Sequence, residues 1–225
     1  MNQQRRFADR VEAGRILAEE MRKRGYGDRG DVIVLALPRG GAPVGYEVAR
    51  ELHAPLDLFI VRKLGVPGHE ELAMGAIASG GATVLNQDVI ETLRIPNEVV
   101  HAVARKEMEE VRRREREYRG ERARPNLKGK TVILVDDGLA TGSTMLAAVR
   151  AVGLLGAERI VVAVPVAARE TCEMFEQEVD ETVCAITPEP FHAVGIWYEN
   201  FEQTSDEEVR ELLGKAREEM QALSH

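Results

Sequence analysis

The sequence predicts an α/β fold in which an open parallel sheet of about five strands carries helices on both faces. Two observations predict it. Short apolar runs recur along the chain without the polar alternation of a half-exposed strand, as expected for strands that are buried on both sides. Stretches with helical periodicity separate these runs. Alternation of this kind favours parallel strands, because the helices serve as the crossover connections.

The first half of this pattern ends at residue 61. Apolar side chains fall on one helical face before a glycine-rich stretch that ends the first helix. The next apolar run stops at Pro38, and Gly40 and Gly41 follow it. The expected elements are a helix at 8–24, a strand at 31–37, a helix at 42–53 and a strand at 56–61.

The second half repeats the pattern more clearly. An apolar run ends in two aspartates, a loop of small residues leads into a helix, and further strands and a helix follow. The expected elements are strands at 131–136, 159–165 and 181–186, and helices at 143–155 and 168–177. Ligands of open parallel sheets bind outside the carboxyl ends of the strands, so a site is expected in the loops that follow them.

Two stretches interrupt the alternation. Residues 62–86 are rich in glycine and carry a weak two-stranded pattern over 75–79 and 83–86, which predicts a hairpin or a mobile flap. Residues 97–122 are expected to form a charged helix with Asn97 as its N-cap. Mixed-sign charges at i, i+4 spacing indicate a solvated face on this helix, although RNA binding there stays open.

Composition and charge exclude several classes of protein. The chain has 30 Lys and Arg against 38 Asp and Glu, and a formal net charge of −8 argues against nucleic acid as a partner. No stretch approaches the roughly 18 apolar residues of a membrane span, and the N-terminal residues lack the apolar region of a secretory signal. We therefore expect a cytoplasmic protein that does not bind membranes. Cys172 and Cys184 show no metal-binding spacing, and we expect buried small apolar residues rather than a disulfide framework.

The residues that indicate a chemical function follow the expected strand at 131–136. Asp136 and Asp137 end a buried strand, and the small residues after them lead directly into a helix. Converging backbone N–H groups and the positive end of a helix suit a phosphate dianion. The expected cradle consists of Ala140, Thr141, Gly142, Ser143 and Thr144. Adjacent carboxylates can accept hydrogen bonds from vicinal sugar hydroxyls or hold a hydrated Mg²⁺, so the segment suggests a ribose 5-phosphate.

This segment resembles the signature with which type I phosphoribosyltransferases bind phosphoribosyl diphosphate (PRPP): an apolar strand, two acidic residues and a Thr-Gly-x-Thr turn. A plain strand-to-helix turn would explain Gly142 and Ser143, but neither the paired aspartates nor the two threonines. The resemblance covers about residues 30–190. It implies that Asp136 and Asp137 hold the ribose and, through water, Mg²⁺.

Two further stretches resemble parts of the same family. Arg39, Gly40 and Gly41 resemble its diphosphate loop, in which bare backbone N–H groups and a cation face the leaving group. Residues 62–68 resemble the start of its catalytic flap, which closes over PRPP, and Lys63 is the expected cation near the diphosphate. A glycine pair alone would equally suit a simple turn, and a lysine alone a solvated position.

The loop pattern is most similar to that of the adenine-type enzymes, but the match is incomplete. The 6-oxopurine enzymes carry an Asp at the position of Ala140, and an alanine cannot handle a proton of the base. The adenine-type enzymes place a Glu in the flap, for which Glu70 and Glu71 are the candidates. The aromatic run around that Glu is absent here, so the acceptor base stays unassigned.

Members of the family cover the base with a variable hood. Four of the ten aromatic residues lie at 188–201, and Trp197 and Tyr198 are the expected base-binding residues. A small apolar cluster under a long loop would explain the same aromatics equally well. The expectation is one domain over 1–225, with a core at about 30–190, a hood from 1–30 and 187–204, a flap at 62–86, the charged helix at 97–122 and a C-terminal helix at 205–223.

The resemblance implies a glycosyltransferase that moves the 5-phosphoribosyl group from PRPP to a nitrogenous base and releases diphosphate. It implies Mg²⁺ as cofactor, a small heterocyclic base as second substrate, and a homodimer. The expected catalytic residues are Arg39, Lys63, Glu70 and Glu71. The alternative is a regulatory protein that senses PRPP or a nucleotide on the same fold without turnover. Diphosphate transfer to ribose 5-phosphate would require a longer chain with a doubled domain pattern.

Overall fold

A computed structural model of the chain describes residues 6–223 and confirms the predicted α/β class. The main sheet has five parallel strands in the order β2-β1-β6-β7-β8. The strands are β1 (Val32–Ala36), β2 (Leu56–Leu58), β6 (Thr131–Val135), β7 (Arg159–Val166) and β8 (Glu181–Ile186). The chain adds β2 on one side of β1, and β6, β7 and β8 on the other. The strand order therefore reverses between β1 and β6, which is where sheets of this kind open a ligand-binding crevice.

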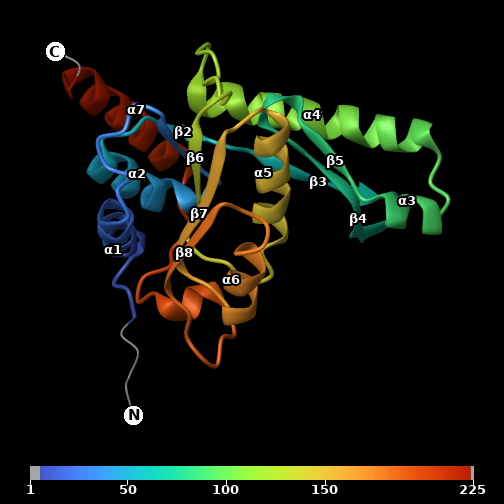
Figure 1. Ribbon diagram of the computed structural model, residues 1–225. Helices are drawn as coiled ribbons and strands as arrows, with labels where there is room; N and C mark the ends of the chain where they lie inside the picture. Colours follow the sequence, from blue (N-terminus) through green and yellow to red (C-terminus); the bar gives the residue numbers. More distant parts are fainter. Residues whose placement is uncertain (1–5, 224–225) are drawn as a thin grey trace.

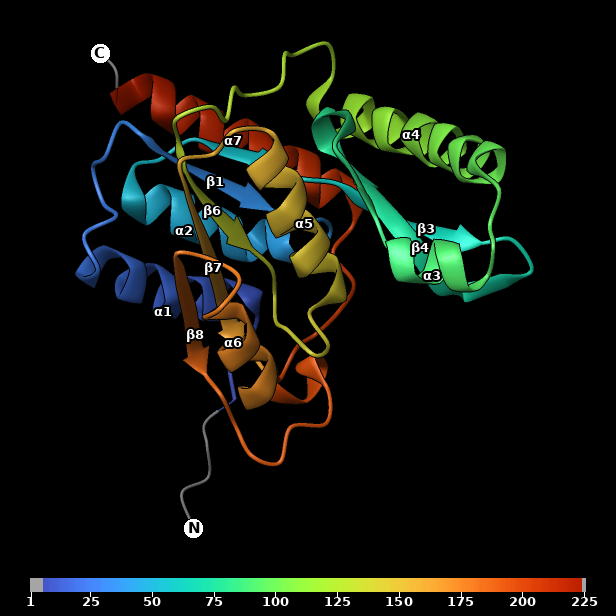
Figure 2. The same ribbon diagram turned by 45° about the vertical axis from the view of Figure 1, so that its right-hand side comes forward.

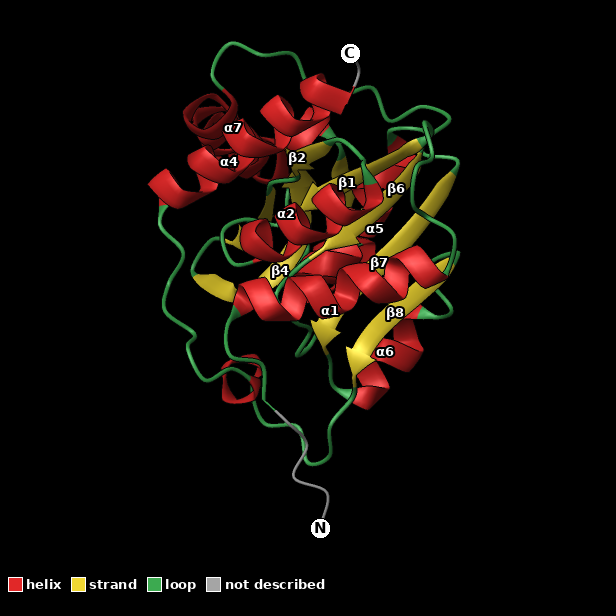
Figure 3. Ribbon diagram, turned by 90° about the vertical axis from the view of Figure 1, so that its left-hand side faces the viewer, coloured by secondary structure: helices red, strands yellow, loops and turns green. Residues whose placement is uncertain are grey.

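Helices cover both faces of the main sheet (Figure 1, Figure 3). One face carries α1 (Arg10–Lys23) and α2 (Gly41–Leu52), and the opposite face carries α5 (Ser143–Leu154) and α6 (Arg169–Phe175). Successive strand residues are buried in different layers: Val34 packs in the cluster with α1 and α2, whereas Leu35 packs in the cluster with α5. This double coverage explains why the strands read as continuous apolar runs.

A second, smaller sheet projects to one side of the main sheet (Figure 2). It comprises β3 (Val61–Val66), β4 (His69–Ala78) and β5 (Thr83–Leu85), all antiparallel, with a 3₁₀ turn, η1 (Ser79–Gly81), before β5. It lies between α5 and α4 (Asn97–Arg119), and α3 (Gln87–Thr92) follows β5. We call residues 61–85 the flap sheet. The predicted hairpin is confirmed by the pairing of β4 with β5.

The flap sheet corrects one predicted strand. The apolar run at 56–61 was expected to form a single strand of the main sheet, but β2 ends at Leu58 and Val61 already begins β3. The N–H of Phe59 still donates to Ala36, whereas Val61 pairs with Ala78 of β4. The run stays apolar because it is buried in both sheets, so hydrophobicity alone does not mark the change of sheet.

The charged helix is present, with two differences from the prediction. Pro96 is the N-cap of α4, and Asn97 is the first helical residue instead of the cap. The solvated face is confirmed where Arg113 and Arg114 pair with Glu110. Arg119, however, is buried at the end of this helix.

The C-terminal helix α7 (Asp206–Leu223) packs on α2 and α4. Its predicted cap is confirmed, because the hydroxyl oxygen of Ser205 accepts a hydrogen bond from the N–H of Glu208 at 3.1 Å. The segment that connects β8 to α7 contains a 3₁₀ turn, η2 (Val194–Trp197). Within the part of the chain that the structure describes, no helix is long and apolar enough to cross a membrane. Residues 1–5 of the expected hood lie outside the described residues.

Candidate functional site

The candidate site lies at the carboxyl ends of β1 and β6, where the two halves of the main sheet meet. Ala36 and Val135, the last residues of these neighbouring strands, are partners in the strand register. The loop that contains Arg39 therefore begins beside the loop that Asp136 opens, although the two are distant in the chain. The site coincides with the reversal of strand order.

Gly40 and Gly41 are required by contact with the acidic pair. A Cβ added to Gly40 would lie 2.1 Å from Oδ2 of Asp137, and one added to Gly41 would lie 2.8 Å from the carbonyl oxygen of Val135. Neither distance is possible between non-bonded atoms, and neither glycine needs a positive φ. The loop with the glycine pair is thus in direct contact with Asp136 and Asp137. The structure brings together two motifs that the sequence identified separately.

The two aspartates are only partly exposed, and burial makes their charged forms unfavourable. The N–H of Asp137 donates to Oδ1 of Asp136 at 2.8 Å. Burial raises the pKa of both carboxyl groups, and the charge of Asp137 raises the pKa of Asp136 further. A ligand that donates hydrogen bonds or carries a cation would offset this cost, so the pair is suited to binding polar groups.

Arg10 and Tyr198 both form hydrogen bonds with Asp137. Nε of Arg10 lies 2.9 Å from Oδ2 of Asp137, and the two side chains are 11% and 16% exposed. This guanidinium lowers the pKa of Asp137 against the effect of burial. The hydroxyl of Tyr198 donates to the main-chain carbonyl of Asp137 at 2.5 Å. No local pattern in the sequence singles out Arg10, because it is one of several arginines near the N-terminus.

The predicted cradle consists of a loop and the first two residues of α5. Gly142 has a φ of 72°, and a Cβ added to it would lie 2.7 Å from the ring of Phe175. Only glycine fits both conditions. Thr141, Ser143 and Thr144 are exposed, and the hydroxyls of the first two lie 3.2 Å apart. The first N–H groups of α5 have no acceptor within the helix, so amides and hydroxyls can converge there on an anion.

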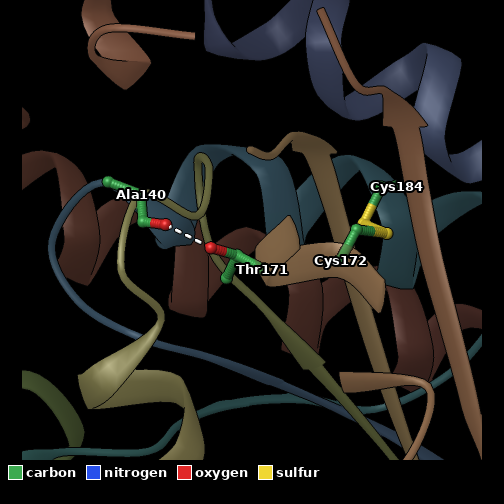
Figure 4. The surroundings of a disulfide bond; sticks show 4 residues. All are labelled: Ala140, Thr171, Cys172 and Cys184. Atoms are coloured by element: carbon green, nitrogen blue, oxygen red, sulfur yellow. Dashed lines mark hydrogen bonds between the residues drawn. A yellow bond between two sulfur atoms is a disulfide. The ribbon is translucent and has the colours of Figure 1, made fainter. Parts of the chain in front are cut away.

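Helix α6 supports this loop and carries a disulfide (Figure 4). The hydroxyl of Thr171 donates to the carbonyl of Ala140 at 2.6 Å. The next residue, Cys172, is bonded to Cys184 of β8, with Cα atoms 6.6 Å apart. The expectation of two unbonded apolar cysteines is therefore wrong. The pairing follows from the packing of α6 against β8, which spacing along the chain does not reveal.

Of the three flap residues predicted for catalysis, Lys63 shares a cavity with the cradle. A cavity of about 550 Å³ lies between the flap sheet and α5, and its lining includes Lys63, Ser143 and Thr144. Glu70 and Glu71 are exposed at the start of β4 and are not part of that lining. The N–H of Gly68 donates to Glu70 at 3.2 Å, and backbone hydrogen bonds lower the pKa of its carboxyl group. A lowered pKa makes Glu70 a weaker proton acceptor in this conformation.

Arg39 lies on the loop beside the acidic pair, but its guanidinium points to another carboxylate. Nη1 of Arg39 is 3.8 Å from Oδ1 of Asp206, the first residue of α7. The two side chains are 34% and 40% exposed, so this ion pair is weak and the arginine can turn to another anion.

The two aromatic candidates of the hood have different surroundings. Tyr198 is 3% exposed, and its ring centroid lies 5.5 Å from that of Phe7 and 5.0 Å from that of Phe201. Trp197 is half-buried, and its indole N–H is buried without a hydrogen-bond partner among residues 6–223. Tyr198 is therefore held within a protein cluster, whereas Trp197 retains an unused donor.

The phosphoribosyl transferase domain model matches residues 5–197, which include the acidic pair, the cradle, the glycine loop and the flap sheet. The chain belongs to the phosphoribosyl transferase domain family. The matched region covers far more than half of the chain and ends at Trp197.

Two comparisons add relatives within this family. In two strains of Mycobacterium tuberculosis, a protein provisionally named a phosphoribosyl transferase is 45% identical over 210 residues, 93% of this chain. The match covers 47% of that protein, so the chain spans about half the length of the curated relatives it matches. The crystal structure of TT1426 from Thermus thermophilus is 40% identical, covers 93% of this chain and 98% of its own, and has a TM-score of 0.82.

Proposed function

We propose that this chain transfers the 5-phosphoribosyl group of PRPP to a nitrogen atom of a heterocyclic base and releases diphosphate. One observation carries the proposal: the glycine loop after β1 contacts the acidic pair, which leads directly into the cradle before α5. PRPP presents diphosphate, ribose and 5-phosphate in the same order along its length. Membership of the phosphoribosyl transferase family supports this reading.

The cradle and the acidic pair would bind the part of PRPP that is transferred. The hydroxyls of Thr141, Ser143 and Thr144, with the first N–H groups of α5, would hold the 5-phosphate. Asp136 and Asp137 would accept hydrogen bonds from the ribose hydroxyls. Two anchored groups fix the sugar, so that a bound base meets the anomeric carbon in a defined orientation.

The second set of residues would act on the leaving group. The N–H groups of Gly40 and Gly41, with Arg39 and Lys63, would stabilise the negative charge that develops on the diphosphate. The transition state is expected to resemble an oxocarbenium ion, which water captures readily. Closure of the flap sheet would exclude that water.

The donor set fits Mg²⁺ only in a supporting role. Across residues 6–223, no group of three or more His, Cys, Asp or Glu side chains is arranged to hold a metal ion. Mg²⁺ keeps several waters and binds through one or two carboxylates together with substrate phosphates, so Asp136 and Asp137 would hold it through water. Bound there with PRPP, Mg²⁺ would supply charge neutralisation at the diphosphate.

The acceptor base is the open part of the proposal. Trp197, whose indole N–H has no hydrogen-bond partner among residues 6–223, remains the candidate that would contact a base, whereas Tyr198 would act through its hydrogen bond to Asp137. Glu70 or Glu71 would manage the proton of the nucleophile only after the flap sheet moves, because neither lines the cavity beside the cradle. A homodimer is proposed on the family resemblance alone.

Diphosphate release from Mg²⁺-supplemented PRPP, measured with a panel of purine and pyrimidine bases, tests the proposal. We expect release that depends on one base and a lower Kd for PRPP than for ribose 5-phosphate. The variant Asp136→Asn with Asp137→Asn should lose at least about 100-fold in PRPP affinity, because several hydrogen bonds to charged groups disappear. Unchanged affinity in this variant, with a native circular dichroism spectrum, would refute the ribose-binding role.

One observation favours a sensor of PRPP as the second candidate. Ala140 cannot exchange a proton with a base, and Glu70 and Glu71 lie away from the cavity, so neither predicted flap glutamate reaches the cradle in this conformation. Tight PRPP binding without diphosphate release for any base in the panel would support the sensor and exclude the transferase.

A further inference from the structure

Arg10 is fixed by three groups at the start of α1. Besides its 2.9 Å ion pair with Asp137, it donates from Nη1 to the carbonyl of Glu202 at 2.6 Å. Its guanidinium carbon lies 3.9 Å from the ring centroid of Phe201. Within residues 6–223, it is the only cationic side chain within 4.0 Å of either aspartate of the pair. A side chain that is 11% exposed and held by three partners has little freedom to leave.

Two of the three partners of Arg10, Phe201 and Glu202, belong to the hood. The N–H of Phe7 donates to the carbonyl of Trp197 at 2.9 Å, and the N–H of Asn200 donates to the carbonyl of Ala8 at 2.9 Å. We call residues 7–10 with 197–202 the hood tether. Through Arg10 this tether reaches the carboxylate of Asp137, and through Tyr198 it reaches only the main chain.

The two oxygens of Asp137 have different surroundings. Oδ2 accepts from Arg10 and lies against Gly40, where an added Cβ would approach it to 2.1 Å. Oδ1 lies farther from that position, at 3.4 Å, and is not the oxygen that accepts from Arg10. Arg10 thus binds Oδ2, the oxygen that lies against Gly40, and Oδ1 is the oxygen that a ligand could contact.

We propose that Arg10 is a positioning residue that orients the Asp137 carboxylate for the ribose hydroxyls of PRPP and couples the hood tether to PRPP binding. The inference rests on the proposed function, because it assumes that PRPP occupies this site. Its physical basis is that a carboxylate held at one oxygen by a buried guanidinium loses little rotational entropy when the other oxygen accepts a ligand.

In a competing interpretation, Arg10 and the ligand compete for the carboxylate of Asp137. If Mg²⁺ or ribose had to displace the guanidinium from Asp137, removing Arg10 would tighten PRPP binding. The position of Oδ2 against Gly40 argues against displacement of Arg10, since Gly40 leaves no room for a ligand atom on that side. The two interpretations predict opposite changes in affinity, which makes them easy to separate.

The test compares Arg10→Ala and Arg10→Lys with a matched control on the same helix, Arg15→Ala. Arg15 is 61% exposed and pairs with Glu47, away from the acidic pair. We expect Arg10→Ala to raise the Kd and KM for PRPP by roughly 10- to 100-fold, the loss of one hydrogen bond between charged groups, with a smaller change in kcat. Arg10→Lys should recover much of the affinity, and Arg15→Ala should match the unmodified protein.

Trp197 gives a second readout, because it is the single tryptophan of the chain and lies in the hood tether. We expect Mg²⁺ and PRPP to change its fluorescence in the unmodified protein, and saturating PRPP to change it much less in Arg10→Ala. If Arg10→Ala does not fold, Arg10→Gln takes its place with the same expectation.

Unchanged or tighter PRPP binding by the folded Arg10 variants would overturn the inference. So would equal loss of affinity in Arg10→Ala and Arg10→Lys without any recovery. Failure of the unmodified protein to bind PRPP would instead refute the proposed function, so the two failures are distinguishable.

Discussion

Asp136 lies at a position where its charged form is unfavourable, and this gives a prediction about stability. Its pKa is raised by burial and by Asp137, so between about pH 3.8 and the raised pKa the folded protein binds more protons than the unfolded chain. The free energy of unfolding therefore falls as pH rises through this window. Asp136→Asn removes the cost and should stabilise the fold at pH 8 by on the order of 1 kcal/mol, with a smaller gain at pH 5. Urea unfolding at the two pH values measures both.

The exposed residue Glu199 offers a matched control for that experiment. Glu199→Gln also removes one carboxylate but should leave stability nearly unchanged at both pH values. A variant Asp136→Asn that is less stable than the unmodified protein at pH 8 would contradict the prediction. Gain of stability with loss of PRPP binding would mark Asp136 as a residue at which function opposes stability.

Gly40 provides the second prediction at the scale of a single residue. Gly40→Ala would bring a methyl group to 2.1 Å from Oδ2 of Asp137, so the aspartate or the glycine loop must move. We expect PRPP affinity to fall by about 10-fold or more, because both parts of the site are displaced. Isothermal titration calorimetry measures the change. Gly30→Ala is the control, since Gly30 has open space around the added atom and should bind PRPP normally.

At the scale of elements, the apolar runs and the phosphate-loop pattern were enough to predict the main sheet and its helices. Burial on both faces makes the strands continuous apolar runs, and these can be recognised directly in the sequence. The start of β3 at Val61 could not be predicted in this way, because its partner strand β4 lies in the glycine-rich stretch at 62–86, where the strand pattern is weak. Short α3, which Asn86 caps with its side chain, was missed because six residues carry little periodicity.

The disulfide between α6 and β8 leads to a prediction for these two elements. Cys172→Ala with Cys184→Ala should lower the free energy of unfolding by about 3 kcal/mol, the chain-entropy value for a short closed loop. Because Thr171, next to Cys172, supports the carbonyl of Ala140, PRPP affinity should also weaken. Thermal unfolding with and without reductant checks the first effect. Reductant should destabilise the unmodified protein and leave the double variant unchanged.

An intact protein whose stability is the same with and without reductant would contradict that prediction. Thiol titration under denaturing conditions separates the reasons: two free thiols before reduction would mean that the bond does not form. Thr171→Val, which removes only the hydroxyl, should weaken PRPP binding without changing the response to reductant.

At the scale of the molecule, the sequence predicted the loops of the site but not what joins them. Asp136 and Thr144 belong to one local segment, so their pattern is visible in the chain. The contact of Gly40 with Asp137 and the ion pair from Arg10 depend on strand order and on the packing of α1, which lie beyond any local pattern. Tyr198 was expected at the base because it is aromatic, yet its burial and its bond to Asp137 arise only from the hood tether.

The two sheets share α5, and this shared helix predicts how a ligand would affect the whole molecule. The cavity of about 550 Å³ between the flap sheet and α5 is lined by Lys63 on one side and Ser143 and Thr144 on the other. An anion held there would draw β3 toward the start of α5.

Hydrogen exchange followed by mass spectrometry should therefore slow in β3, β4 and the first turn of α5 when Mg²⁺ and PRPP are added, and stay constant in buried β7. Lys63→Ala should abolish the slowing in β3 and retain it in α5, because the helix would still hold the 5-phosphate. Equal protection of β3 in both proteins would mean that the flap sheet closes without this lysine.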